Sequence, residues 1–597
     1  MRRWSERRVG IGRGRTVLLL LAAVLGSRNA WSTMTRGDVE AQLSYSLQST
    51  MQHNGVANPE WVQERNEVNG LFTYHFLKSH SLFGSLKLPF VEDGVFHLQY
   101  RVRFDPVYLA RDHYDDIYST SQQHKFALPD EYQTPREVFL DLDFGDVGPG
   151  HLSSRIGKQQ IVWGEADLFR SIDVFNTFRL DQNFFLGERF DDFRVPVFAT
   201  KFLYDVGQVG PVANVGIEAA WSPDAHPLTD HAIVEEILDL PFDPVRRSNH
   251  LPYADVRNPW SIIRVGPGHN DAPDRGVFPR GAFGGATGDF IYLVQDRWPS
   301  FGVHNSEAGL RILGKLGDAD FTLNYLYKRT EVPGGGVEWQ ELFYPNGNPK
   351  LNDPSIGHTF ASCLAGRPTF VVGKSIRGYA NSIGTGCTHI FLWYPWTHIV
   401  GGTMTYNDFK YTGLIWRLEE SVSTKEPRNR ALPLVGDRAY QLPNQQDFAT
   451  KSTTDTLVWR SMIGFDLLRA FPFLPTRHDQ WLISMQLLNE YNANVKNQIG
   501  QLFEVHERMH HWNPTATLLA TGFFMNSRFR PIIAGAYEFN SRFPVLWLQG
   551  EYYVNPRLSI RAGEILYMGS QFSANPLFLN KFADRDEAYI RFIYWLL

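Results

Sequence analysis

The chain has few cysteines, no excess of positive charge and no long apolar run. Two cysteines in 597 residues exclude a multi-disulfide framework, a zinc ribbon and an iron–sulfur array. The absence of apolar runs of about 20 residues excludes a polytopic helical membrane protein. Charged residues make up 20% and the formal net charge is −5, so we expect no nucleic-acid partner.

The first 32 residues predict a secretory signal peptide. Six arginines precede a short apolar run, Val17–Gly26, and the small residues Ala30 and Ser32 follow it. This order of a basic region, a short apolar core and a small-x-small cleavage site is typical of secreted bacterial proteins. We therefore expect export, with residues 1–32 removed and residues 33–597 forming the mature protein.

The rest of the chain reads as β-strands. Apolar and polar residues alternate with a period of two in Gly94–Pro106, Glu137–Phe144, Asp320–Lys328 and Gln480–Leu487. Such alternation predicts sheets with one apolar and one polar face. Aromatic residues, 14% of the chain, recur near the ends of these segments and argue against disorder.

Alternation alone does not say which face points inward. A soluble sandwich buries its apolar face, whereas a membrane barrel turns that face to lipid. Tight links between strands, charged residues on the polar face and aromatics near strand ends favour the barrel. The final segment, Asp586–Leu597, is a strand that runs to the last residue, as in many outer-membrane barrels, although these usually end on an aromatic residue.

We therefore predict an all-β fold, a single transmembrane antiparallel β-barrel of roughly 16 strands in the cell outer membrane. Two long inserts, at about 222–305 and 332–402, interrupt the strand pattern. We expect one of them to fold inward and narrow the lumen. The second insert holds Cys363 and Cys387, which we expect to form a disulfide in an oxidising compartment; two buried thiols are the alternative.

A resemblance to a known family is carried by Gly157–Asp167, Asp173–Asn176 and Asp192–Pro196. These segments resemble the G-K-Q-x-V-x-W-G-E-A-D, D-x-x-N-P and R-x-P motifs of uncharacterised Gram-negative outer-membrane proteins, catalogued only as a domain of unknown function. This chain departs from them at Thr177, which stands where the family has proline. The resemblance implies one outer-membrane barrel that handles apolar molecules, beside export machinery, with no established catalytic residue.

The same motif allows two physical interpretations. Trp163 and Gly164 would lie at the membrane interface, because tryptophan anchors barrels there. Lys158, Glu165 and Asp167 would form either a polar plug facing the lumen or a corner that fixes strand register, and the turn-forming residues favour the corner. The lumen or transport candidates are Arg101, Arg103, Asp141, Asp143, Lys158, Trp163, Glu165, Asp167, Arg417 and Glu419.

An enzymatic alternative rests on His506-Glu507-Arg508-Met509-His510, which matches H-E-x-x-H. On a helix this spacing would offer two imidazoles and a general base to a zinc ion, as in a secreted all-β zinc hydrolase. The third histidine of metzincins is missing, and the pattern is short enough to occur by chance. We therefore expect no enzyme, no cofactor and no metal.

The leading functional hypothesis is an outer-membrane channel or transporter for small hydrophobic or lipid-like solutes. A plugged structural barrel, or a partner of a lipid export system, is the alternative. The expected partners are outer-membrane lipid, a hydrophobic small molecule and export-system proteins.

Overall fold

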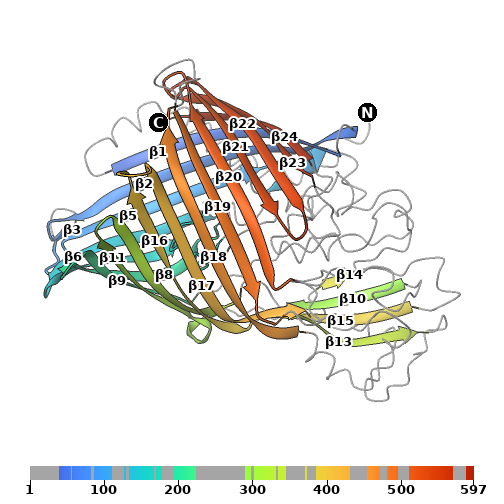
Figure 1. Cartoon of the computed structure of the whole chain (residues 1–597), viewed down its shortest axis with the longest axis horizontal. Helices are drawn as coiled ribbons and strands as arrows, with labels where there is room; N and C mark the ends of the chain where they lie inside the picture. Colours follow the sequence, from blue (N-terminus) through green and yellow to red (C-terminus); the bar gives the residue numbers. More distant parts are fainter. Residues whose placement is uncertain are drawn as a thin grey trace.

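The computed structural model of the chain is a closed β-barrel with a small separate sheet (Figure 1). The structure describes residues 39–54, 57–82, 86–110, 127–128, 134–166, 170–177, 194–223, 289–296, 301–330, 334–343, 370–372, 385–429, 453–470, 480–494, 510–568 and 586–596. Within these ranges, no helix is long and apolar enough to cross a membrane.

The main sheet has 20 strands, of which β3 (Ser81–Leu82) and β4 (Leu86–Lys87) are two-residue strands between β2 and β5. The other 18 form the ring. In chain order the first nine are β1 (Val39–Asn54), β2 (Ala57–Lys78), β5 (Asp93–Phe104), β6 (Pro135–Val147), β7 (Gly150–Gln159), β8 (Val197–Val209), β9 (Val212–Ser222), β11 (Glu307–Leu316) and β12 (Ala319–Arg329). The next nine are β16 (Trp396–Asp408), β17 (Leu414–Asn429), β18 (Thr453–Arg469), β19 (Gln480–Asn492), β20 (Trp512–Phe523), β21 (Phe529–Glu538), β22 (Phe543–Asn555), β23 (Leu558–Tyr567) and β24 (Asp586–Trp595).

Each ring strand pairs antiparallel with its neighbours, and β1 closes the ring on β24 from Ser44↔Trp595 to His53↔Asp586. Closure leaves no unpaired edge among these strands. The predicted antiparallel barrel is confirmed, but the predicted count of about 16 strands is too low. The ring holds more strands because several links, such as those after β6, β8 and β11, are only two residues long.

In the barrel wall, apolar side chains face outward and polar side chains face the interior. On β12, Leu323 points outward and is 61% exposed, while its neighbour Asn324 points inward and is 4% exposed. The same holds on β5, where Arg101 and Arg103 are buried in the interior and Tyr100 is exposed. A soluble protein would bury the leucine, so this alternation is that of an outer-membrane-type barrel.

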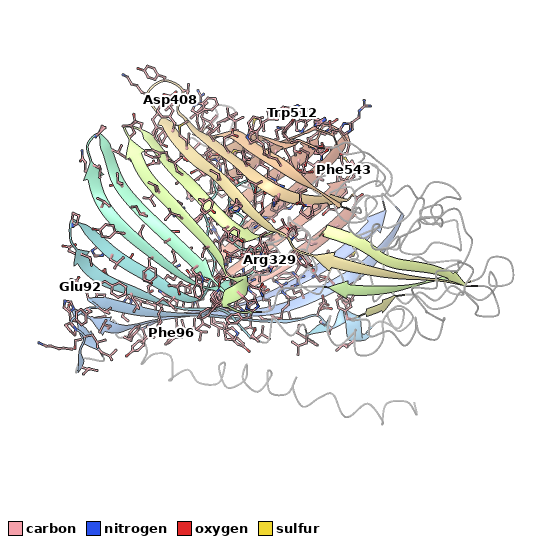
Figure 2. All side chains as sticks on the ribbon, turned by 90° about the horizontal axis from the view of Figure 1, so that it is seen from below. Glu92, Phe96, Arg329, Asp408, Trp512 and Phe543 are labelled. Atoms are coloured by element: carbon pink, nitrogen blue, oxygen red, sulfur yellow. The ribbon has the colours of Figure 1, made fainter. Side chains whose placement is uncertain are left out.

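The two ends of the barrel differ. At one end, here called the short-turn end, tight links join β6 to β7, β8 to β9 and β11 to β12, and Gly148 and Gly317 take positive φ angles of 65° and 61°. Only glycine adopts such angles without strain. The long connections, including both predicted inserts, leave from the opposite, long-loop end. In Figure 2, Glu92 and Asp408 mark the short-turn end at the left.

Outward-facing aromatics cluster toward the long-loop end. Trp512 lies 4.5 Å from Tyr491 and 5.8 Å from Trp459, measured between ring centroids, and Tyr327 stacks on Trp396 at 4.7 Å. Rings with a polar edge suit the boundary between lipid and water. Figure 2 places Trp512 on the outer wall of this half of the barrel.

The predicted inserts share a four-stranded sheet. Its order is β13 (Gly334–Phe343), β15 (Thr385–Trp393), β10 (Asp289–Asp296) and β14 (Phe370–Val372). Strand β10 comes from the first insert and pairs in parallel with β15 from the second. Figure 1 shows this sheet beyond the long-loop end. The described strands of this sheet therefore do not fill the lumen. Most of both inserts lies outside the described residues, so the expectation that one of them folds inward stays a prediction.

Candidate functional site

A different connection enters the barrel. Residues 160–166 and 170–177, between β7 and β8, are here called the inward segment. Its side chains Ile161, Trp163, Ile172 and Phe175 form a buried apolar cluster with inner-wall residues. Those wall residues are Val197, Ala199, Ala220, Leu326 and Ile399, from β8, β9, β12 and β16. The segment thus lies against the inside of the wall.

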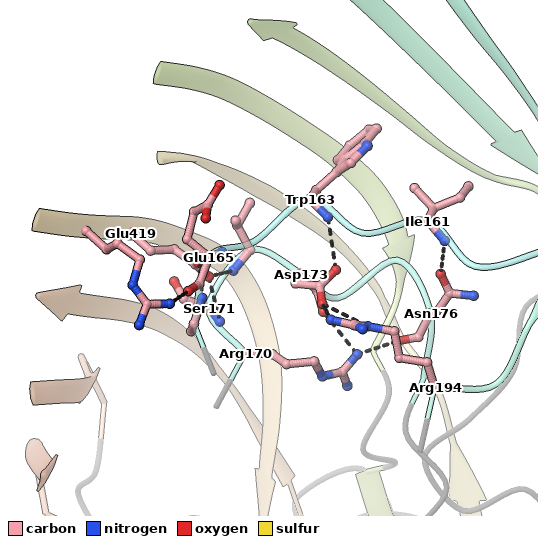
Figure 3. A network of polar contacts seen from close by, with 12 residues as sticks. Ile161, Trp163, Glu165, Arg170, Ser171, Asp173, Asn176, Arg194 and Glu419 are labelled. Atoms are coloured by element: carbon pink, nitrogen blue, oxygen red, sulfur yellow. Dashed lines mark hydrogen bonds and ion pairs between the residues drawn. The ribbon is translucent and has the colours of Figure 1, made fainter. Parts of the chain in front are cut away.

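Glu419 on β17 anchors the segment. Its side chain is 0% exposed and accepts hydrogen bonds from four backbone amides: Glu165 at 2.7 Å, Ala166 at 3.2 Å, Ser171 at 3.0 Å and Ile172 at 2.7 Å (Figure 3). A buried carboxylate is stable only when such donors replace water. The contact joins residues about 250 positions apart in the chain.

Asp173 makes the second anchor. Its Oδ1 accepts from the backbone amide of Trp163 at 3.0 Å, and its Oδ2 accepts from Nε of Arg194 at 3.0 Å and also from Nη2 of that residue. Both side chains are buried. Arg170 donates to the carbonyl of Asp173 at 3.1 Å. Because breaking one partner of a buried ion pair is costly, this pair fixes the fold of the segment.

Asn176 ties the two ends of the segment together. Its Oδ1 accepts from the amide of Ile161 at 2.6 Å, and its Nδ2 donates to the carbonyls of Gln159 at 3.3 Å and Val195 at 2.8 Å. The asparagine therefore bridges the end of β7 and the residues that lead into β8. The motif residues that carry the family resemblance, Asp173, Asn176 and Arg194, are the ones that shape this segment.

Further contacts bind the segment to other wall strands. The hydroxyls of Ser171 and Ser421 are 2.9 Å apart, and Ser421 also donates to the carbonyl of Ser171 at 2.9 Å. Lys328 on β12 donates to the carbonyl of Val174. Arg417 donates to the carbonyl of Glu165 at 2.6 Å and to Asp466 at 2.8 Å. The segment is thus held by β12 and β17.

The expected place of Trp163 at the membrane interface is wrong. Trp163 is 2% exposed, and its indole nitrogen donates to Glu218 on the inner face of β9 at 2.5 Å. A Cβ on Gly309 would lie 2.5 Å from the indole, so only glycine leaves room for the ring there. Small residues on the inner wall make the cavity that the tryptophan fills.

Arg101 and Arg103 face the interior, as the alternation predicts. Arg103 donates twice to Glu67 on β2, at 3.0 and 2.8 Å. Arg101 and Arg591 each lie 3.8 Å from the same carboxylate. Three arginines of β5 and β24 therefore surround one buried glutamate.

The acidic candidates of β6 also face the interior. Asp141 accepts two hydrogen bonds from Arg155, at 2.6 and 2.9 Å, and lies 3.1 Å from His97. Asp143 lies 2.8 Å from His151. The lumen wall is thus lined by paired charges of both signs, as on β17, where Arg417 and Glu419 point inward together.

Lys158 does not face the lumen. It pairs across the sheet with Val138 and Phe198, which lie on the outward face, and directly opposite residues share a face. Its ammonium donates to the carbonyl of Pro135 at 3.2 Å. Lys158 therefore lies at the outer rim, because β7 places alternate residues on opposite faces.

The other predicted features are only partly within the described residues. Glu165 joins the inward segment through its backbone, and its side chain is exposed. The signal peptide, Asp167, Cys363 and His506–Met509 lie outside the described residues, so the cleavage site, the disulfide with Cys387 and the H-E-x-x-H hypothesis stay predictions. Among the residues described, no three metal-ligating side chains come together.

A cavity of about 340 Å³ opens beside the inward segment. Its walls come from β1, β2, β5, β23 and β24, and Arg136 of β6 and Gln160 complete it. The charged lining residues are Glu67, Arg101, Arg136, Arg561 and Arg591. A volume of this size is within the range of small-molecule sites.

One acid beside the wall has an altered titration. Asp105 follows β5, and burial raises the pKa of its carboxyl to about 6. Its Oδ1 accepts from the amides of Glu64 at 3.0 Å and Val107 at 3.1 Å, and these bonds with the charge of Arg65 oppose the effect of burial. Burial dominates because it removes water from the charged form.

The family comparison agrees with the motif. Residues 12–219 match the family described as Protein of unknown function (DUF1302). This confirms the resemblance over that stretch, which includes the inward segment. No curated protein matches the chain at a significant level.

Solved structures that are similar to this chain are outer-membrane proteins. A BenF-like porin from Pseudomonas fluorescens Pf-5 is 8% identical with a TM-score of 0.38, over 94% of this chain and 99% of that chain. OmpF of Salmonella typhi in complex with daunomycin is 7% identical with a TM-score of 0.34, over 94% and 98%. The loop L8 deletion mutant of OmpT from Vibrio cholerae is 9% identical with a TM-score of 0.31, over 94% and 99%.

Sequence reasoning missed several interior residues. Glu67, Arg561 and Arg591 meet only because β24 closes on β1, and nothing local reports that closure. Glu218 and Ser421 likewise gain their partners from a connection that enters the barrel. Asp173, Asn176 and Arg194 were visible within the motif, but their roles depend on the fold of the segment.

Proposed function

We propose that this protein is an outer-membrane channel for small amphiphilic or hydrophobic solutes, with a lumen narrowed by the inward segment. The observation that carries the proposal is the Glu419 anchor, which holds a connecting segment against the inner wall through four backbone amides. A connection pinned inside a barrel reduces its open cross-section. The inside-out polarity of the wall supports a location in lipid.

The character of the solute rests on the cavity. Leu71, Ile593 and Trp595 line it together with polar groups. An apolar lining favours solutes with apolar surface, because removing that surface from water lowers the free energy of the bound state. A plugged structural barrel and a partner role in lipid export are the competing functions. The conductance experiment below separates both of them from a channel.

Conductance in planar bilayers tests the channel and its constriction. Glu419→Gln replaces one carboxylate oxygen with an amide group that faces backbone donors, so the segment should loosen and conductance should rise. Glu420→Gln is the matched control, because Glu420 points outward on the same strand and contacts Trp459. A folded barrel that conducts in neither form would contradict the proposal and favour the plugged barrel.

Uptake of a fatty-acid-like tracer by cells with and without the protein tests the solute. We expect slower uptake when the gene is deleted and recovery when it is restored. Unchanged uptake, together with normal conductance, would reject a hydrophobic solute while keeping the channel.

A further inference from the structure

The cavity beside the inward segment carries an excess of positive charge. Among the described residues that line it, four are arginines, Arg101, Arg136, Arg561 and Arg591, and Glu67 is the single acid. The remaining polar lining is glutamine, asparagine and serine. A concave, partly enclosed surface of this kind favours an anion, since guanidinium groups bind carboxylates with directed hydrogen bonds.

Two of these arginines are direct neighbours. Arg561 of β23 and Arg591 of β24 lie opposite each other in the antiparallel register, both on the inner face. Like charges placed directly opposite destabilise a sheet. Glu551 lies 3.3 Å from Arg561, and Glu67 lies 3.8 Å from Arg591, so each arginine has one acid nearby. A second anion placed between the pair would further offset their repulsion.

The apolar part of the lining is arranged in order along the strands. On β24 the inward residues Arg591, Ile593 and Trp595 follow one another toward the short-turn end. On β2 the inward residues Glu67 and Asn69 are followed in the same direction by Leu71. On both strands the charged end therefore lies deeper in the barrel than the apolar end.

We propose that this cavity is a binding site for a small amphiphilic carboxylate. The carboxylate contacts Arg561 and Arg591, and the apolar tail lies along Ile593 and Trp595 toward the short-turn end. This inference deepens the proposed function, on which it rests, by naming the class of solute that the channel takes up. A volume of about 340 Å³ accommodates a molecule of the size of a medium-chain fatty acid.

Equilibrium binding to the folded barrel tests this site without requiring transport. Octanoate, neutral octanamide and cationic octylamine would be titrated by calorimetry into the full-length protein in a non-ionic detergent. We expect octanoate to bind at least ~10-fold more tightly than octanamide, since one charge-assisted hydrogen bond is worth about that ratio. Octylamine should show no saturable binding.

Arg591→Gln should reduce octanoate affinity ~10-fold or more and leave octanamide binding unchanged. The variant should fold, because Arg103 still pairs with Glu67 when Arg591 is removed. Heat-dependent gel mobility would verify folding. Arg528→Gln is the matched control, since it removes the same charge from an exposed turn at the short-turn end and should bind octanoate like the wild type.

The binding results test the carboxylate site separately from the proposed channel. Equal affinity for octanoate and octanamide, or an Arg591→Gln variant that binds octanoate normally, would overturn the carboxylate site, whatever the conductance experiments give. Arginine-dependent octanoate binding in a barrel that does not conduct would support the site and overturn the channel.

Discussion

Single residues in the interior decide how closely the inward segment packs on the wall. Trp163 lies on Gly309, and any side chain at that position would collide with the indole. The tryptophan also gives its indole proton to Glu218. The space that the indole fills therefore requires glycine at 309, and the hydrogen bond to Glu218 requires the indole N–H of Trp163.

Gly309→Ala should lower the unfolding midpoint of the barrel in detergent, because overpacking of this kind costs about 1–3 kcal/mol. Gly70→Ala is the control, since a Cβ there would meet only ordinary contacts, the nearest atom lying at 3.7 Å. Heat-dependent gel mobility measures both variants. Equal midpoints for the two would show that Trp163 does not pack as described.

Asp105 should make stability depend on pH. Because the folded pKa is raised to about 6, the folded state binds more protons than the unfolded state between about pH 4 and pH 6. Stability contributed by the neutral carboxyl is present at low pH and lost as the pH rises through this window. The effect is opposite to that of an acid in an ion pair.

Asp105→Asn keeps a neutral group at this position and should remove that loss. The stability of the variant relative to the wild type should be greater at pH 7 than at pH 4.5, measured by urea unfolding in detergent. Asp318→Asn, in an exposed turn, should show no such difference. A constant gap between Asp105→Asn and wild type at both pH values would contradict the effect.

At the scale of one element, the inward segment behaves as part of the wall. It has almost no regular secondary structure, yet Glu419, Asp173 and Asn176 satisfy its backbone groups. Buried backbone amides need such partners, so an irregular segment inside a barrel requires polar side chains at fixed places. Asp173 and Asn176 belong to the segment itself, whereas Glu419 comes from β17, about 250 positions farther along the chain.

A disulfide can test that placement. In a chain with Cys363 and Cys387 replaced by serine, Ser171→Cys with Ser421→Cys should oxidise readily, because the two hydroxyls are 2.9 Å apart. Ser171→Cys with Ser423→Cys is the control, since position 423 lies one inward position farther along β17. Mass spectrometry after mild oxidation would measure the cross-link. Equal yields in both pairs would contradict the anchored position.

At the scale of the whole molecule, the two faces of each strand have different solvents. Leu98 on β5 pairs with Phe72 and Val138 on the outward face, while Arg101 points inward near Glu67. Charged side chains inside the barrel form ion pairs with one another, and apolar side chains outside it contact lipid. The sequence alternation is the same whichever face is buried.

Leu98→Arg should impair assembly by about 2–4 kcal/mol, the cost of arginine facing the middle of the bilayer. Arg101→Leu should assemble normally, because Arg103 remains paired with Glu67, but it should change conductance. Assembly into liposomes, followed by gel mobility, distinguishes the two variants. The reverse pattern would mean that the faces are assigned the wrong way round.

The sequence alone determined the strands, because a period of two is written in neighbouring residues such as Phe96 to Phe104. It also determined that Arg101, Arg103, Asp141, Asp143, Arg417 and Glu419 share the polar face. Several two-residue links, such as those at Gly148 and Gly317, were also legible, because glycine marks turns that need positive φ angles.

The tertiary structure decided what depends on distant pairing. Ring closure brought Glu67 to Arg591, and the entry of the inward segment into the lumen brought Trp163 to Glu218 and the segment backbone to Glu419. Strand register turned Lys158 outward, and the pairing of β1 with β24 closed the ring at 18 strands. These contacts join residues from 55 positions apart, for Trp163 and Glu218, to 254 positions apart, for Glu165 and Glu419, or farther, and local propensity carries no information about such pairings.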